Sequence, residues 1–242
     1  MRIFLHFDSF SKNHKKSVTK YLTKGNDWCI IKSQNNQNKK RGAYMTLEDV
    51  ASIRTGVVTT RKKAGEKDPV VHKYKLLNLK CAASAGYLDL QYAEVLGTTE
   101  ALKPEFFTQM DDILVRLSAP YTAIMITRED WCGYLVPSHF AIIRVDRTVA
   151  LPEYILWSLK REATMQKILQ NISGSGAFGT INSKFFNTLT IRILPLNKQY
   201  IIGQMQILSE KEQELLHKLT AQKEVYNKLM IDKIYESVKR GN

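Results

Sequence analysis

Short runs of apolar, β-branched and aromatic residues recur through the middle of the chain, and Gly, Pro or polar residues separate them. Runs of this length and composition are typical of β-strands. On this basis we predict five strands: Tyr74–Leu79, Asp112–Leu117, Thr122–Thr127, Phe140–Val145 and Leu189–Leu194.

Two helical patterns accompany these strands. In Thr46–Ile53, Thr46 is a suitable N-cap, and Glu48 and Asp49 stand in the first turn, where carboxylates favour the helix dipole. In Leu151–Ile172, apolar residues recur at helical spacing after Pro152. We therefore expect a short helix to open the domain and a longer one to precede the last strand, which makes the middle of the chain a mixture of α and β.

The C-terminal region shows a heptad-like apolar pattern, with Gly203 as the only Gly or Pro between Pro195 and Gly241. A helix of roughly 40 residues would be about 60 Å long, too long to pack wholly on one small domain. We predict a coiled-coil helix over residues 198–240, with an amphipathic helix folded back on its own domain as the alternative. The predicted interface is Met205, Leu208, Leu215, Leu219, Tyr226 and Leu229. Glu212, Gln222 and Lys233 interrupt this pattern, and such polar positions fix register or partner at a cost in stability.

The charge of the chain favours a polyanionic partner. The net charge is +13 and the pI about 9.6, and an excess positive field attracts nucleic acid. An acidic protein partner, or a surface that only aids solubility, remains the alternative. Residues 1–43 hold ten Lys or Arg against two Asp, which is +8 of the total, so we interpret them as a basic N-terminal arm. Within the arm, Ser33–Gly42 has the composition of a flexible linker, and a domain over residues 44–197 follows it.

Cysteine usage and hydropathy indicate a cytoplasmic protein. Cys29, Cys81 and Cys132 lie far apart without a CxxC pair, so neither a disulfide framework nor a zinc site is expected. No apolar stretch approaches the ~20 residues that cross a bilayer. We expect no membrane association.

One glycine motif raises the question of a nucleotide site. Gly174–Gly179 matches GxGxxG, but it follows a predicted helix rather than a strand, and no GK[ST] occurs. We interpret this loop instead as a tip whose hydroxyls, backbone amides and side-chain amide suit a DNA groove. A plain connection between two elements is the alternative.

The candidate DNA contacts fall into two groups. Cations around the Gly- and Pro-containing loop Thr59–Pro69, together with one lysine near the last strand, are candidates for phosphate binding, although such residues are also common on solvated surfaces. These are Arg61, Lys62, Lys63, Lys73, Lys75 and Lys184. For contact with bases or the groove we predict Ser118, Tyr121, Ser175, Phe178, Thr180 and Asn182.

No catalytic, cofactor-binding or metal-binding residue is predicted. An adenine methyltransferase needs an Asn/Asp-Pro-Pro-aromatic tetrad, which does not occur. Asp111 with Asp112, and Glu129 with Asp130, are adjacent pairs whose members would point to opposite faces if they lay on strands, rather than converging on a metal. We interpret the chain as a binding protein rather than an enzyme. A metal-dependent nuclease, and a coiled-coil protein without a DNA role, remain alternatives.

The order of elements over about residues 44–240 resembles the specificity subunit of type I restriction-modification systems. The matching features are the strand Asp112–Pro120, a Gly/Ser loop at Gly174–Gly176, Ile181 with a polar residue, a strand running into Pro195, and Gln199 opening the long helix. Three positions depart from the pattern. Leu194 and Leu196 flank a single proline, Lys198 precedes the glutamine, and Asp111 stands where a glycine is usual.

The resemblance implies a half-size specificity subunit with one target-recognition domain. Partner methyltransferase and translocase-nuclease subunits would hold S-adenosylmethionine, ATP and Mg. The C-terminal helix would pair with a second copy, giving a bipartite and palindromic target, or with a different half-subunit. The competing interpretation is a non-catalytic DNA-binding adaptor of another defence or mobile-element system.

Overall fold

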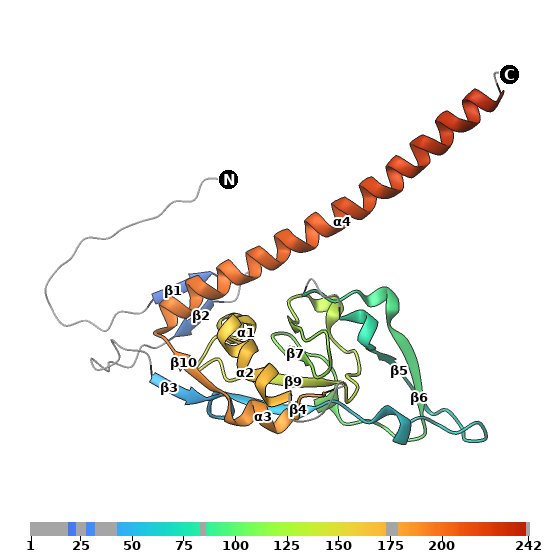
Figure 1. The fold of residues 1–242 in the computed structure, drawn as a ribbon. Helices are drawn as coiled ribbons and strands as arrows, with labels where there is room; N and C mark the ends of the chain where they lie inside the picture. The colour runs from blue at the N-terminus through green and yellow to red at the C-terminus, as the bar shows by residue number, and fades with distance from the viewer. Residues whose placement is uncertain (1–18, 23–27, 32–42, 83–85, 173–178, 241–242) are drawn as a thin grey trace, which may run out of the picture. The chain divides into compact units, whose positions relative to one another are not determined.

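The computed structural model describes residues 19–22, 28–31, 43–82, 86–172 and 179–240 (Figure 1). The chain divides into two units, Met1–Arg41 and Gly42–Asn242. In the first unit, strands β1 (Thr19–Leu22) and β2 (Trp28–Ile31) pair antiparallel. This strand pair is not among the elements predicted for the basic segment, and the whole of the expected linker Ser33–Gly42 lies outside the described residues.

The second unit holds all the remaining elements. Its strands are β3 (Ala43–Thr46), β4 (Ala51–Thr55), β5 (His72–Leu76), β6 (Glu94–Thr98), β7 (Ile113–Arg116), β8 (Ala123–Met125), β9 (Phe140–Val145) and β10 (Thr190–Ile193). Its α-helices are α1 (Pro152–Lys160), α2 (Glu162–Ile172), α3 (Ser183–Thr188) and α4 (Leu196–Arg240). Single 3-10 turns lie at Leu47–Asp49, Thr59–Arg61, Leu79–Cys81, Leu90–Tyr92, Pro104–Phe106 and Glu129–Trp131.

The centre of this unit is an antiparallel sheet with the strand order β4-β9-β7-β8. Successive side chains of a strand point to opposite faces. Ile113 and Val115 accordingly join the core beneath α1, whereas Leu114 joins the core on the other face. Because both faces are covered, the inner strands are continuous apolar runs rather than alternating ones. The strands predicted for these runs are confirmed.

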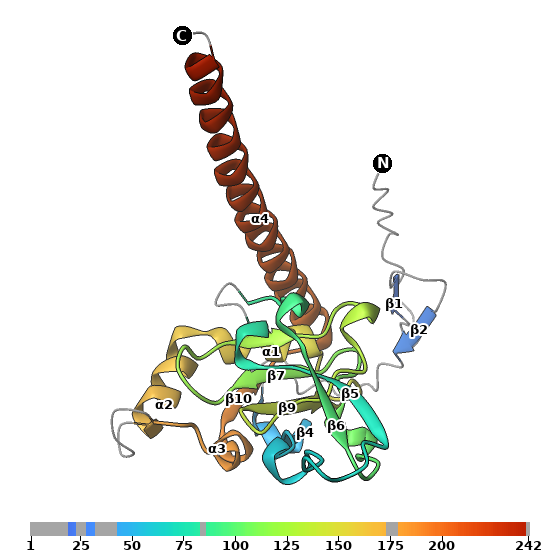
Figure 2. The ribbon, with the colours of Figure 1, turned by 90° about the vertical axis from the view of Figure 1, so that its right-hand side faces the viewer.

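Helices cover one face of the sheet and irregular segments the other (Figures 1 and 2). The helical face buries Tyr154 and Leu156 of α1 and Phe186 of α3. The opposite face is covered by residues of long connections, among them Leu77 and Trp131. Two strand pairs complete the unit: β3 with β10, and the ribbon β5–β6, which lies over a small separate apolar cluster.

The expected opening helix is much shorter than predicted. Only one 3-10 turn forms at Leu47–Asp49, and the carboxylate of Asp49 accepts hydrogen bonds from the backbone N–H and the hydroxyl of Thr46. The next residues, from Ala51, form strand β4 instead. The prediction of helix there was wrong because the capping signal specifies a helix start but not a length, and Ile53 pairs into the sheet opposite Ile143.

The helix expected over Leu151–Ile172 is in fact two helices, because the chain breaks at Arg161. This residue has extended backbone angles, φ −60° and ψ 140°. Its N–H donates to Trp157 O and closes α1, while its carbonyl accepts from Thr164 and Met165 and opens α2. Neither Gly nor Pro stands at the break, and the helical spacing of apolar residues continues across it. The sequence therefore gives no local signal that the helix ends there.

The long C-terminal helix is confirmed, and it begins at Leu196, two residues earlier than predicted. Its 45 residues correspond to about 65–70 Å, and its C-terminal half extends beyond the rest of the unit (Figure 2). It is not wholly folded back on its own domain. Within the described part of the chain, no helix combines the length and the apolarity that crossing a membrane requires.

Candidate nucleic-acid interface

Strand register brings several loops together at one end of the central sheet. The last residue of β4, Thr55, pairs with Ala141 near the start of β9. The last residue of β7, Arg116, pairs with Phe140, the first of β9. The segments after β4, between β7 and β8, and before β9 therefore all leave the sheet at the same end. We call this region the loop end.

A fourth segment, residues 179–184, joins the loop end from the helical side. Ile181 N–H donates to Leu117 O at 2.8 Å, and the Tyr121 hydroxyl donates to Gly179 O at 2.8 Å. The Thr55 hydroxyl donates to Ser183 Oγ at 2.8 Å. These bonds join residues far apart in the sequence, and they give the loop end a defined backbone rather than a loose collection of tips.

Five predicted contact residues lie at or beside the loop end. Ser118 and Tyr121 are half-buried in the β7–β8 loop, and Thr180, Asn182 and Lys184 are exposed. Asn182 has a structural role that the sequence interpretation missed, because it is the N-cap of α3 and its Oδ1 accepts from Lys184 N–H at 3.0 Å. The remaining two residues predicted for contact with bases or the groove, Ser175 and Phe178, lie outside the described residues.

The predicted basic residues Arg61, Lys62 and Lys63 follow β4 by a few residues and are exposed. The Lys62 ammonium lies 3.8 Å from the Glu100 carboxylate, but both side chains are exposed and such a contact is weak. For Arg61 and Lys63, no ion pair occurs in the part of the chain that is described. Their charge is thus available to an anion.

Lys73 and Lys75 stand on the exposed side of the β5–β6 ribbon, and Lys75 lies 5.4 Å over the Tyr134 ring. Gly97 of β6 connects them to the loop that precedes β5, because it is the register partner of Lys73 and its carbonyl accepts from Ala64 N–H at 2.9 Å. The fold thus gathers these cations on one ribbon and its adjoining loop.

Two further residues at the loop end were not predicted. The Arg116 guanidinium donates to Ala119 O at 2.9 Å, which supports the β7–β8 loop from beneath, and its Nε is buried without a hydrogen-bond partner. His139 is exposed, and its carbonyl accepts from Leu117 N–H. Arg116 could have been found from the sequence, because it is a cation at the end of an apolar strand. No local pattern distinguishes His139.

Polar contacts hold the first half of α4 against the domain. Gln199 is fully buried, accepts from Leu151 N–H at 2.9 Å and donates to Leu194 O at 2.7 Å. The Lys160 ammonium of α1 pairs with Glu210, and the Tyr87 hydroxyl meets His217 Nδ1 at 3.1 Å. The glutamine that the resemblance places at the start of the helix therefore connects the helix to the domain through buried hydrogen bonds.

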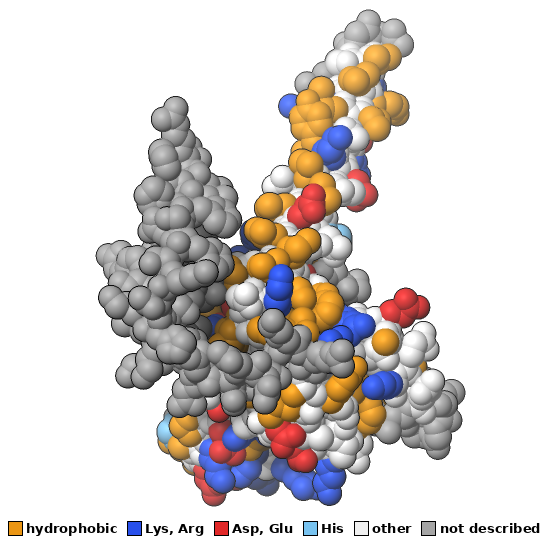
Figure 3. All heavy atoms as spheres, turned by 90° about the vertical axis from the view of Figure 1, so that its left-hand side faces the viewer, with side chains coloured by type: hydrophobic (Ala, Val, Ile, Leu, Met, Phe, Trp, Pro, Cys, Tyr) orange, Lys and Arg blue, Asp and Glu red, His pale blue; other side chains and the backbone are white. Residues whose placement is uncertain are grey.

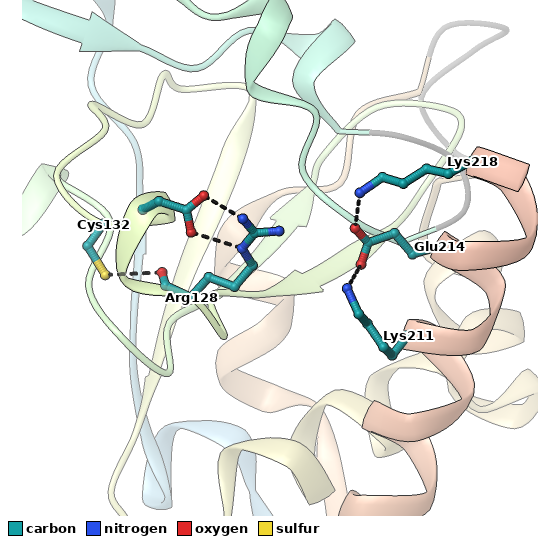
Figure 4. A network of polar contacts seen from close by, with 6 residues as sticks. Arg128, Cys132, Lys211, Glu214 and Lys218 are labelled. Carbon is teal, nitrogen blue, oxygen red and sulfur yellow. Dashed lines mark hydrogen bonds and ion pairs between the residues drawn. The ribbon is translucent and has the colours of Figure 1, made fainter. Parts of the chain in front are cut away.

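Glu214 is a buried carboxylate within this contact. It is 5% exposed and accepts from Lys211 and Lys218 of its own helix (Figure 4). Burial opposes its ionisation, but the hydrogen bonds from Lys218 and Lys211 outweigh burial and hold the pKa of Glu214 below its ordinary value. Arg128, which is paired with Asp130, faces it from the domain and feels its charge.

All six residues predicted for the coiled-coil interface are more than half exposed on α4. Apolar side chains follow the helix in a long stripe (Figure 3). Further exposed apolar residues continue toward the C-terminus and were not predicted, because they leave the heptad spacing: Val225, Met230, Ile231, Ile234, Tyr235 and Val238.

The chemistry of the described residues gives no sign of a metal centre, since no group of three or more His, Cys, Asp or Glu among them could hold an ion. Asp111 adopts φ 69°, a conformation that favours glycine, at the position where the resemblance expects glycine. The carboxylate of Asp111 pairs with Arg147.

Neither a family model nor a curated protein matches the sequence. Solved structures do match, and they define the fold as that of a type I restriction-modification specificity subunit. One neighbour is a chain from a structure described as the structural basis of complex assembly and conformational transition of the type I R-M system. It matches this chain with a TM-score of 0.51 at 14% sequence identity, and the match covers 77% of this chain and 42% of the neighbour. A second neighbour, the HsdS subunit from Thermoanaerobacter tengcongensis, matches with a TM-score of 0.50 at 14% sequence identity, and the match covers 73% of this chain and 44% of the neighbour. This chain thus spans less than half the length of either neighbour.

Proposed function

We propose that this chain recognises a DNA sequence as a non-catalytic specificity subunit of a type I restriction-modification complex. The observation that carries the proposal is the loop end. Four segments far apart in the sequence meet there, and they present exposed hydroxyl, amide and cationic side chains on a fold shared with specificity subunits. Groups of this kind contact phosphates and base edges.

Binding divides into two contributions. Cations of the loop after β4 and of the β5–β6 ribbon contact phosphates, and their contribution to the binding free energy depends on salt but not on the DNA sequence. Side chains of the β7–β8 loop and of residues 179–184 contribute the term that distinguishes bases. Partner subunits supply adenine methylation, translocation and cleavage, and the complex acts on a bipartite site.

The long helix supplies the second contact that this function requires. The exposed apolar stripe of α4 pairs with a helix of a second copy, and burial of its leucines drives the pairing. Symmetric pairing places two recognition units on one DNA and makes the two half-sites palindromic.

The function is tested by expressing the chain with a partner methyltransferase subunit in a host without DNA methylation and reading adenine methylation by single-molecule sequencing. A split motif with palindromic halves is the expected result. An assembled complex that leaves every adenine unmethylated would contradict the proposal and favour an adaptor role.

The division of labour is tested on two loop-end positions. Lys63→Ala should weaken binding to target and non-target duplexes alike, because Lys63 contributes only to the phosphate term. Asn182→Ser should reduce the preference for the target by about tenfold or more, and it retains the side-chain oxygen that caps α3. Comparison with Asn182→Ala separates loss of the cap from loss of base contact. Equal losses on both duplexes for every variant would refute the division.

A further inference from the structure

A cationic pocket lies away from the loop end, where the α1–α2 junction faces β10. Its volume is about 250 Å³. Arg161 and Lys167 line it from the helical side and Arg192 from β10, with hydroxyls of Ser158, Thr164 and Thr190 between them. We call it the α2 pocket. It shares no lining residue with the loop end or with the stripe of α4.

The charge of the α2 pocket has one sign. Three of its lining residues are cations and none is Asp or Glu. Across the described residues, no ion pair involves Arg161, Lys167 or Arg192. Three like charges around one concavity repel each other and raise its affinity for an anion. Two other arginines of the domain have a different environment, since Arg144 and Arg147 are each paired with a carboxylate.

The fold holds this arrangement in place. The break between α1 and α2 brings Arg161 to the rim, and its guanidinium lies 5.1 Å from the centroid of the Trp157 ring, a contact that restricts the side chain. The hydroxyl of buried Tyr154 donates to the carbonyl of Arg192, which fixes β10 against α1. Ser158 is 4% exposed and forms part of the interior wall.

We infer that the α2 pocket binds a phosphate group. Two arginines and a lysine supply the charge-assisted hydrogen bonds that phosphate oxygens accept, and arginine forks match pairs of those oxygens. The hydroxyls supply further donors. The phosphate belongs either to a nucleic-acid backbone or to a free nucleotide, and both sources offer the same chemistry to these side chains.

Calorimetric titration of the full chain with inorganic phosphate and with a nucleoside monophosphate tests the free-ligand source. Fluorescence anisotropy with a duplex of arbitrary sequence, over a series of salt concentrations, tests the backbone source. The variants are Arg161→Gln, Lys167→Gln and Arg192→Gln, whose side chains are exposed. The matched control is Lys198→Gln, an exposed cation close to Arg192 in sequence that does not line the pocket.

For a free nucleotide we expect saturable binding that each pocket variant weakens by about tenfold or more and that Lys198→Gln leaves unchanged. For a backbone phosphate we expect no binding of the small phosphates. In the duplex assay, the slope of log K against the logarithm of the salt concentration should become smaller by about one in each pocket variant. If pocket variants and control behave alike in both assays, the inference is wrong. If the wild-type chain binds no duplex, the proposed function fails, and the small-phosphate titration still decides the pocket.

Discussion

The two halves of α4 differ in how the rest of the chain covers them. From Leu196 to Lys218, one face of the helix contacts the domain, and Gln199, Gly203 and Glu214 are buried there. From Leu219 onward, every large apolar residue with a described side chain is exposed. The same helix therefore has an anchored half and a free half.

This difference shows that the predicted apolar seam does not identify the docked face of the helix. Other apolar residues pack against the core of the domain: Leu196, Tyr200, Ile202 and Ile207. Two polar residues and a glycine add to this docking. Gln199 and Glu210 form hydrogen bonds or ion pairs with the domain, and Gly203 permits close approach to α1. The predicted seam that includes Leu208 and Leu215 faces away from the domain. Exposed apolar stripes of this extent on a charged protein indicate an association surface rather than a core.

The largest expected effect comes from the free half. Replacing Leu219 and Leu229 together by Glu should weaken self-association by about 100-fold or more, because each chain loses two buried leucines and gains charge at the interface. Sedimentation equilibrium measures the association. The thermal unfolding of the domain should not change, since both leucines are more than half exposed.

The matched control for this experiment is Lys228→Glu. At about 100° per residue, position 228 lies half a turn around the helix from Leu219, so the same acidic side chain is introduced away from the seam. Self-association of this variant should remain close to that of the wild type. A wild-type chain that is monomeric at all concentrations would exclude pairing with a second copy and leave a different helix as the partner.

Much of the fold follows from local sequence, but the exceptions have physical reasons. The inner strands are predictable because both of their faces are buried, so the runs around Ile113 and Ile142 are continuously apolar. Strand β4 is an edge strand whose Ser52 is exposed, and it follows a helix-capping signal. The break at Arg161 depends on tertiary packing, because no residue at that point opposes a continuous helix.

The loop end is predictable in composition but not in assembly. Residue type suggests contact with DNA for Ser118, Tyr121 and Lys184. Nothing local indicates that Thr55 and Ser183, 128 positions apart, form a hydrogen bond, or that Arg116 supports the β7–β8 loop. The cap that the Asn182 oxygen forms depends on α3 starting at Ser183, a short helix that the sequence does not predict. Long-range register decides these features.

A smaller effect is expected at the close contact in the anchored half. A Cβ at Gly203 would lie 2.7 Å from Glu153 Cβ and 3.1 Å from Tyr154 N, so any larger side chain must separate α4 from α1. Gly203→Leu should lower the free energy of unfolding by about 2 kcal/mol, measured by urea denaturation. Met205→Leu, at an exposed neighbouring position, is the control and should be neutral. A Gly203→Leu protein as stable as the wild type would show that the two helices are not in contact there.

The smallest effect is expected from Glu214, and its dependence on pH distinguishes charge from shape. Glu214→Gln should lower the free energy of unfolding at neutral pH by about 1 kcal/mol, because the side chain keeps its size but loses its negative charge and one of the two oxygens that accept from Lys211 and Lys218. The pKa of Glu214 in the folded protein lies below its ordinary value of 4.5. A carboxylate with a lowered folded-state pKa stabilises above its unfolded-state pKa and loses that contribution as the pH falls through the folded-state value. The difference between wild type and variant should therefore be full at pH 7 and shrink through the acid range below about 4.5. Denaturation curves for both proteins across this range measure it, and a difference that stays constant with pH would mean that Glu214 acts through packing alone.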